Sequence, residues 1–268
     1  MILTLWRSFN RLPAPHGHGP ETLYTFARLH GVFSDAVRVV GALLLTGCTL
    51  GVLPVLAQEP SRAAEIAQCL PGEMGTWGDA QDRPAMRPVL QLAYDHASAP
   101  VWFSEAQVRR ALERAAAGWS QCGVRVRVLE AAEMQSGQVV APVAVRWSDI
   151  LSRGNFGLAN WTQQSLTLGP AAFALLQERN PAHDARETLQ MVISHELGHL
   201  MGLMSHSRRC VDVTSSYDNG KGEVCTVRDR ALLRTVTEYR ATLPTACDIA
   251  RCRIANGLPP LLPTRPSP

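Results

Sequence analysis

The stretch HELGHLMGLMSH, residues 195–206, decides how the rest of this sequence is interpreted. His195 and His199 are four residues apart, so on a helix their imidazoles leave the same face one turn apart and can hold one Zn²⁺ ion. Glu196 lies about 100° round the helix from His195, where its carboxylate can reach a metal-bound water without ligating the metal. Gly202 stands where the helix should stop, because glycine adopts a positive φ at little cost. The stretch therefore predicts a zinc-binding helix that ends in a sharp turn.

The predicted zinc helix runs over residues 185–203, with Asp184 and Glu187 at its N-terminal cap. Apolar residues recur along it at helical spacing and indicate a buried stripe, with His195 and His199 on the opposite face. The stripe consists of Leu189, Ile193, Leu197 and Leu200.

Other helices and strands are predicted on both sides of the zinc helix. An amphipathic helix is expected over residues 104–119, where Ser104 and Gln107 form a capping box. A further helix is expected over residues 227–243, capped by Thr226 and Asp229. Short β-prone stretches predict strands at 99–103, 124–128, 143–147, 156–159 (at a sheet edge) and 165–168.

This arrangement resembles the metzincin clan of zinc endopeptidases, whose pattern is H-E-x-x-H-x-x-G-x-x-H, and within it the matrixin-like bacterial members. The resemblance is specific at 195–202 and extends over about residues 85–245. It implies an α+β, metzincin-like catalytic domain, in which a small mixed, twisted sheet packs with a long helix and the zinc-binding helix. It also implies hydrolysis of peptide bonds by zinc-activated water with Glu196 as general base. An extended protein or peptide substrate would lie along the edge strand near 157–159.

The third metal ligand departs from the family pattern. Ser205 stands where the family has its third histidine, and His206 follows one residue later. Because imidazole suits zinc and a hydroxyl does not, we assign His206 as the third metal ligand. If that ligand failed, a later carboxylate, Glu223 or Glu238, could serve instead, although both are expected to be surface charges.

The methionine turn that the family has under its metal also differs here. No methionine follows Met204, and Ser215 occupies the corresponding position. Tyr217 would then match a tyrosine that some members use as an extra ligand or oxyanion donor. The two departures keep open an alternative function, a catalytically impaired, zinc-stabilised binding module derived from a peptidase. Glu196 favours the enzyme, since a binding module does not need it.

An apolar run of 19 residues, 39–57, predicts export of the rest of the chain. Cleavage after Ala57 would release a soluble periplasmic or secreted protein, and this interpretation is favoured because apolar sequence continues past Cys48. Cleavage before Cys48, in a lipobox-like context, would give a lipoprotein. An uncleaved run would anchor the protein in the membrane.

Six cysteines outside that run predict three disulfides in an exported protein. Short loops close easily, so Cys210–Cys225 and Cys247–Cys252 are the expected pairs, which leaves Cys69 with Cys122. A weaker hypothesis makes Cys69 a thiolate that blocks the zinc in a latent form. Its neighbours do not carry the motif that such relatives have.

Composition sets the remaining limits. The chain has 268 residues, 46% of them hydrophobic and 18% charged, with a net charge of +3, which excludes wholesale disorder. The arginines are scattered and form no basic stripe, so no nucleic-acid partner is expected. The predicted organisation is an N-terminal extension with its signal or anchor (1–57), a metallopeptidase domain (58–257) and a Pro-rich disordered tail (258–268). The domain is expected to be a monomer.

Overall fold

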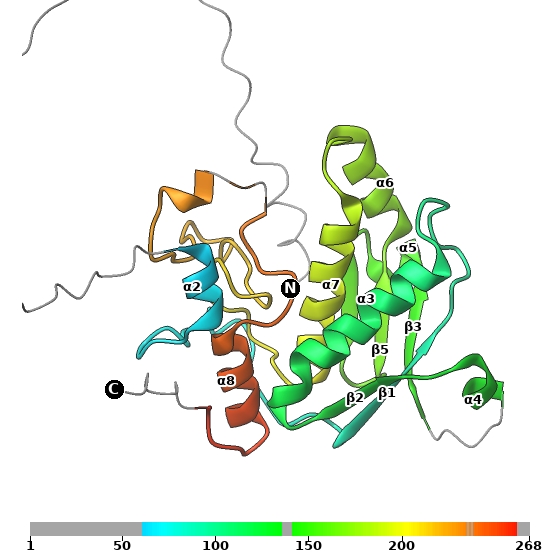
Figure 1. Ribbon diagram of the computed structural model, residues 1–268, viewed down its shortest axis with the longest axis horizontal. Coiled ribbons are helices and arrows are strands. Elements are labelled where there is room, and N and C mark those ends of the chain that lie inside the picture. The colour runs from blue at the N-terminus through cyan, green and yellow to red at the C-terminus, as the bar shows by residue number, and fades with distance from the viewer. Residues whose placement is uncertain (1–60, 136–140, 235, 237, 262–268) are drawn as a thin grey trace, which may run out of the picture. The chain divides into compact units, whose positions relative to one another are not determined.

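The structure is a computed structural model that describes residues 61–135, 141–234, 236 and 238–261 (Figure 1). Its helices are α2 (Arg62–Ala67), α3 (Glu105–Gly118), α4 (Ala131–Gln135), α5 (Asp149–Ser152), α6 (Pro170–Arg179), α7 (Ala185–Leu200) and α8 (Ala246–Ala255), with 3-10 turns η1 (Trp119–Cys122) and η2 (Leu232–Arg234). Its strands are β1 (Val89–Tyr94), β2 (Arg125–Val128), β3 (Val143–Trp147), β4 (Gly157–Asn160) and β5 (Ser165–Leu168).

The apolar run over residues 39–57 lies outside the described residues, as does most of the Pro-rich tail. Within the part of the chain that the structure describes, no helix has the length and apolar character that crossing a bilayer requires.

The five strands form one mixed sheet in the order β2-β1-β3-β5-β4. The first four strands in that order pair in parallel, and β4 runs antiparallel to β5 at the edge. Every second residue of β1 is buried, while the residues between are partly exposed, so this strand has one covered face. The edge position predicted for residues 157–159 is confirmed.

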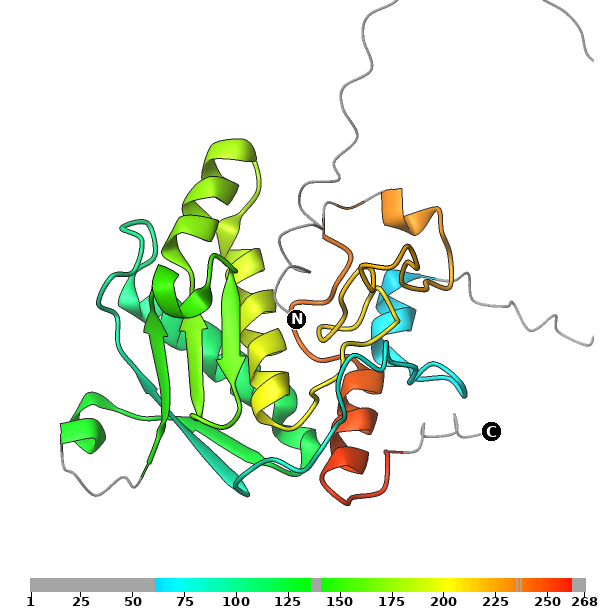
Figure 2. The same ribbon diagram turned by 180° about the vertical axis from the view of Figure 1, so that it is seen from behind.

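Helices α3 and α7 pack on the same face of the sheet, as the two opposite views show (Figures 1 and 2). Helix α3 begins at the predicted capping box, in which Ser104 and Gln107 each bond the other's backbone N–H. At its far end the fully buried Trp119 donates its indole N–H to the backbone carbonyl of Ser194 in α7, over 3.0 Å. This hydrogen bond joins the end of α3 to α7, the helix that carries His195 and His199.

The strand predicted at 99–103 is wrong. These residues form turns, and Val101 is 97% exposed. The first strand is instead β1, whose alternation of buried and partly exposed residues gives the expected period of two. The proline at position 100 favours a turn there, because proline lacks the N–H that a strand needs.

The helix predicted over 227–243 is also wrong, since the described residues of that stretch contain only the 3-10 turn η2. The last helix that the structure describes is α8, which begins at Ala246 with Thr245 as its N-cap. Thr245 and Asp248 form a capping box there, with each side chain bonding the other's backbone N–H. The Thr-x-x-Asp spacing is the sequence pattern that indicates the start of this helix.

All six described cysteines form disulfides, and one of the three predicted pairs is confirmed, Cys210–Cys225. The other two bonds are Cys69–Cys247 and Cys122–Cys252, so the pairs Cys247–Cys252 and Cys69–Cys122 are wrong. Cys247 and Cys252 both lie in α8, where residues five apart point about 140° away from each other and cannot be bonded. The hypothesis of a blocking thiolate at Cys69 fails as well, because its sulfur is in a disulfide.

The disulfides give a testable order of stabilities. The bond Cys122–Cys252 spans 130 residues and Cys210–Cys225 only 15, so the first restricts the unfolded chain more. Replacing Cys122 and Cys252 together by Ala should lower the free energy of unfolding by about 5 kcal/mol, and replacing Cys210 and Cys225 together by about 3 kcal/mol. Urea unfolding measures both. A non-reduced digest that yields a Cys247–Cys252 linkage would contradict the assignment.

Candidate metal centre

Helix α7 presents two imidazoles to the same point. His195 and His199 lie one turn apart, and their Nε2 atoms are 3.2 Å from each other. The prediction that their face is opposite the buried stripe needs correction, because α7 is buried almost all round: His195 is fully buried, as are Leu189, Ile193, Leu197 and Leu200. The loop that follows the helix contacts the histidine face, while β4 contacts α7 at Val192 and Glu196.

Each of the three histidines has its Nδ1 atom within hydrogen-bonding distance of an oxygen acceptor. His195 Nδ1 is 2.7 Å from the carbonyl oxygen of Val213, and His199 Nδ1 is 2.6 Å from that of Leu203. His206 Nδ1 is 2.6 Å from a carboxylate oxygen of Asp79. Since carbonyl and carboxylate oxygens only accept, each Nδ1 carries the proton and donates it. The Nε2 atoms of the neutral rings therefore hold lone pairs.

Lone pairs that face each other repel unless a cation lies between them. The ligand atoms of His195, His199 and His206 all lie within 4.8 Å of one another, and the ring centroids are 4.9–5.3 Å apart. Two imidazole nitrogens on one tetrahedral zinc ion, each about 2.0–2.1 Å from it, lie about 3.3–3.4 Å apart. The 3.2 Å separation on α7 fits that geometry, and an all-imidazole donor set suits zinc.

Burial keeps the imidazoles of α7 uncharged. It lowers the pKa of His195 well below the usual range, and the neighbouring His199 and His206 lower it further. Burial and His206 lower the pKa of His199 to about 3. Neutral imidazole is the form that binds a metal, so this pair is ready for a ligand role at neutral pH.

The turn after α7 depends on Gly202. Its φ is +102°, and a Cβ built on it would lie 1.8 Å from the backbone oxygen of Arg83. In return, Arg83 N–H donates to the Gly202 carbonyl over 3.0 Å. The helix therefore ends at Leu200, not at residue 203, and the chain turns back so that His206 reaches the α7 pair.

Glu196 is buried beside the edge strand. Its Oε2 accepts the backbone N–H of Ala159 in β4 over 2.7 Å. Gly157 makes this approach possible, because a Cβ there would lie 2.7 Å from the Glu196 Cγ and 2.5 Å from Val192. Burial raises the pKa of Glu196 to about 7, against the lowering effects of the Ala159 N–H and the charge of Arg240. A carboxyl with a pKa near neutrality can both accept and return a proton.

The structure brings His195, His199 and His206 together, while Ser205 points away from them. Ser205, at the family's ligand position, donates its hydroxyl to Asp79 over 2.8 Å, and its backbone N–H donates to Asp82. His206 joins the two α7 histidines instead, as assigned. Sequence reasoning missed Asp79 and Asp82, because they stand in a stretch without helical or strand periodicity, far from the motif along the chain.

Polar side chains shape the irregular loop after His206. Asp248 of α8 accepts the N–H of Val213 over 2.9 Å and the hydroxyl of Thr214 over 2.6 Å, and this contact fixes the carbonyl that His195 uses. Ser215, at the methionine position, is fully buried and donates its hydroxyl to the carbonyl of Ser207. This hydrogen bond joins the segments of the loop around Ser207 and Ser215, at the position where the metzincin pattern has a methionine.

Tyr217 does not have the free hydroxyl that the predicted role requires. That hydroxyl donates to Glu238 and accepts the backbone N–H of Tyr239 over 2.7 Å. Glu238 is also not the surface charge that was expected, because its carboxylate forms an ion pair with the buried Arg240 at 2.6 Å. The histidine cluster includes neither Glu238 nor Glu223, and within the described part of the chain no carboxylate takes the place of the third histidine.

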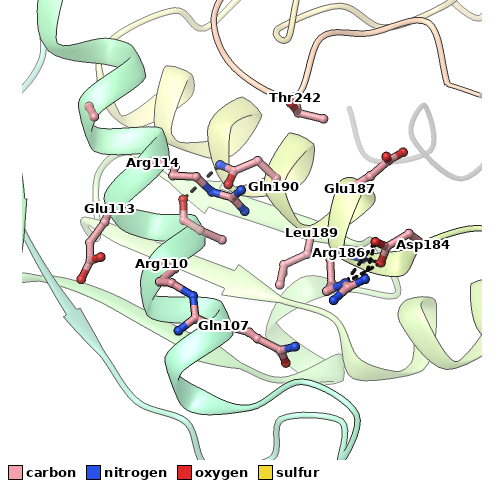
Figure 3. A pocket seen from close by; sticks show the side chains of 12 residues that line it. Gln107, Arg110, Glu113, Arg114, Asp184, Arg186, Glu187, Leu189, Gln190 and Thr242 are labelled. Carbon is pink, nitrogen blue, oxygen red and sulfur yellow. Dashed lines mark hydrogen bonds and ion pairs between the residues drawn. The ribbon is translucent and has the colours of Figure 1, made fainter.

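A hollow of about 810 Å³ lies between α3 and α7, and its lining includes none of the histidines of the cluster (Figure 3). Arg110 and Arg114 line it from α3, and Glu187 and Gln190 from α7. Gln190 donates its amide to the carbonyl of Ala111 over 3.0 Å, which joins the two helices at the base of the hollow. With both signs of charge present, the lining favours no particular class of ligand.

No protein-family model matches this chain, and no curated protein matches it either. Among solved structures, a chain from the GM1-bound form of the ECX AB5 holotoxin is similar at 14% sequence identity and a TM-score of 0.36. The match covers 63% of this chain and 80% of the other. A similarity of that size carries no argument about fold or function, so the function must be inferred from the geometry of the site.

Replacement of Gly202 by Ala should separate the effect of the turn from the general cost of a positive φ. Gly202→Ala places a methyl group on the Arg83 carbonyl, and we expect the free energy of unfolding to fall by about 3 kcal/mol or more. Gly220→Ala is the matched control, because Gly220 has φ +72° with nothing within 4 Å of the added Cβ. Its cost should be about 1 kcal/mol. Equal losses in urea unfolding would show that the contact with Arg83 is unimportant.

The stability of the metal-free protein should depend on the ionisation of Glu196. Because burial raises its pKa from 4.5 to about 7, its contribution to stability is full below pH 4.5 and is lost as the pH rises through 7. In excess chelator, the free energy of unfolding of the wild type should therefore fall relative to that of Glu196→Gln by on the order of 2–3 kcal/mol between pH 5 and pH 8. Urea unfolding at several pH values tests this, with the exposed Glu113→Gln as control. A difference that does not change with pH would contradict it.

Proposed function

We propose that this chain is an exported, zinc-dependent endopeptidase in which His195, His199 and His206 hold Zn²⁺ and Glu196 is the general base. The proposal places the chain with metzincin-like, matrixin-like metallopeptidases. One observation carries it: three imidazoles, each with its Nδ1–H donated to an oxygen, bring their ligand atoms within 4.8 Å of one another beside a carboxylate whose pKa burial raises to about 7.

A zinc ion bound there would supply Lewis-acid chemistry, polarising a peptide carbonyl and making water more acidic. The chain's own contribution begins with Glu196, whose Oε2 is held by Ala159 and whose Oε1 is left to take a proton. Glu196 accepts the proton of the attacking water as the new C–O bond forms. It then gives that proton to the leaving amine as the C–N bond breaks, so that the carboxylate is restored.

The edge strand β4 supports a peptide substrate in an extended conformation. It is the outermost strand of the sheet, paired on one side only, with β5. Its Ala159 contacts the general base directly, so a peptide added along this edge would run past Glu196. Backbone hydrogen bonds of this kind are independent of side chains, so the edge favours a protein or peptide substrate without selecting its sequence.

Export is part of the proposal. Three disulfides are typical of oxidising compartments, and the apolar run over residues 39–57 provides a signal or anchor.

Two substitutions test the reaction. The mature protein should contain about one zinc per chain and cleave casein or a broad peptide library. Glu196→Ala should retain zinc and lose cleavage by about 10²–10⁴-fold, because only proton transfer is removed. His206→Ala should lose cleavage and bind zinc much more weakly through the two remaining histidines, so that the purified variant contains well below one zinc per chain. Metal content is measured by atomic emission and cleavage by mass spectrometry of the products.

The outcomes separate the enzyme from a binding module. Zinc at full occupancy in the wild type, with no cleavage of any peptide, would contradict the enzyme and favour the zinc-stabilised module. Full zinc content in His206→Ala would contradict the ligand assignment and leave the role of Glu196 open to its own test.

A further inference from the structure

The segment 76–84 crosses the loop that carries the displaced histidine. Thr76 bridges Ser207 in the antiparallel sense, and Trp77 N–H donates to the His206 carbonyl over 3.0 Å. At its other end the Arg83 N–H donates to Gly202. The segment thus follows the whole of the turn from Gly202 to Ser207, although its contacts with that turn span 119 residues at Arg83 and 131 at Thr76.

Asp79, in the middle of this segment, makes three contacts with two consecutive residues of the loop. Its Oδ1 accepts the Ser205 hydroxyl over 2.8 Å and the His206 backbone N–H over 3.0 Å. Its Oδ2 accepts the His206 ring Nδ1–H over 2.6 Å. One carboxylate therefore turns Ser205 outward and fixes both the backbone and the ring of His206.

Asp82 and Arg251 hold the backbone on the other side of Ser205. Asp82 accepts the Ser205 N–H over 3.0 Å, and Arg251 donates to the Ser205 carbonyl. The two side chains also form an ion pair at 2.7 Å, which ties the segment to α8. Every polar group of Ser205 is engaged by these partners, so the residue cannot turn toward the metal centre without breaking several hydrogen bonds at once.

We propose that Asp79 is the positioning residue that makes His206, instead of the residue at 205, the third metal ligand. The inference rests on the proposed zinc site and goes beyond it, because it explains how a histidine one position late still faces the α7 pair. The carboxylate fixes the tautomer and orientation of the ring and increases the electron density on Nε2. Partners of this kind that lie behind a metal ligand typically change metal affinity by about 10–100-fold.

A double-mutant cycle on zinc affinity tests the proposal. Asp79→Asn should weaken zinc binding about 10–100-fold, measured by competition with a chromophoric chelator. In the His206→Ala background the same substitution should change affinity less than about twofold, because the ring through which Asp79 acts is absent. The absorption spectrum of Co²⁺ bound to Asp79→Asn should also differ from that of the wild type. Asp95→Asn, an exposed carboxylate in the loop after β1, is the matched control and should behave as the wild type in every assay.

Each result decides between a positioning role and its alternatives. Unchanged zinc affinity in Asp79→Asn would overturn the proposal. An equal loss in both backgrounds would also overturn it, because a general defect of folding persists when His206 is gone. A wild type that binds no zinc would contradict the proposed function itself. Zinc binding that depends on Asp79 without peptide cleavage would support the positioning role and contradict only the enzyme.

Discussion

Three imidazoles can turn Nε2 lone pairs toward one point only if each keeps a proton on Nδ1, the nitrogen that points away. This requirement governs the structure around the centre, because each Nδ1–H needs its own acceptor. The acceptors are supplied by Leu203 just past α7, by Val213 in the following loop and by Asp79 from an earlier segment. The helix provides two of the rings, but the geometry of all three depends on segments that are not helical.

Helix α8 is the element on which those segments converge. Its Asp248 fixes the backbone of Val213 and Thr214, and its Arg251 holds Ser205 and pairs with Asp82. Disulfides from Cys247 and Cys252 attach the same helix to Cys69, just after α2, and to Cys122 in the 3-10 turn η1 that follows α3. An irregular loop gains little stability from its own backbone, so its shape is fixed through these side chains and crosslinks.

The parts of the molecule that follow a local rule could be predicted from the sequence. The capping box at Ser104 locates α3, and the spacing of His195 and His199 with Gly202 locates the centre. The first strand was predicted at 99–103 and lies at 89–94, because proline and turn preferences outweighed the apolar character of the predicted stretch. Asp79 could not be found in this way, since its importance depends on a contact across 127 residues.

The disulfide pairing is a second feature that could not be predicted from the sequence. Proximity along the chain predicts Cys247–Cys252, yet a helical conformation separates those two sulfurs and offers each a distant partner. Likewise a charged residue such as Glu238 is expected at the surface, but its carboxylate accepts the hydroxyl of Tyr217, 21 residues away, and pairs with the buried Arg240. In both cases the tertiary contact outweighs the local preference, and a single sequence contains no record of that contact.

The position of α8 along the chain affects the order in which the molecule is made. A nascent chain that has reached His206 already contains all three histidines and Glu196. It still lacks Asp248 and Arg251, which fix the backbone on which the rings depend, and the partners of Cys69 and Cys122. The contacts that fix the centre are therefore complete only once α8 has been made, and Cys69 and Cys122 meet their partners only then. A chain that is still being synthesised carries the motif without the contacts that fix the centre.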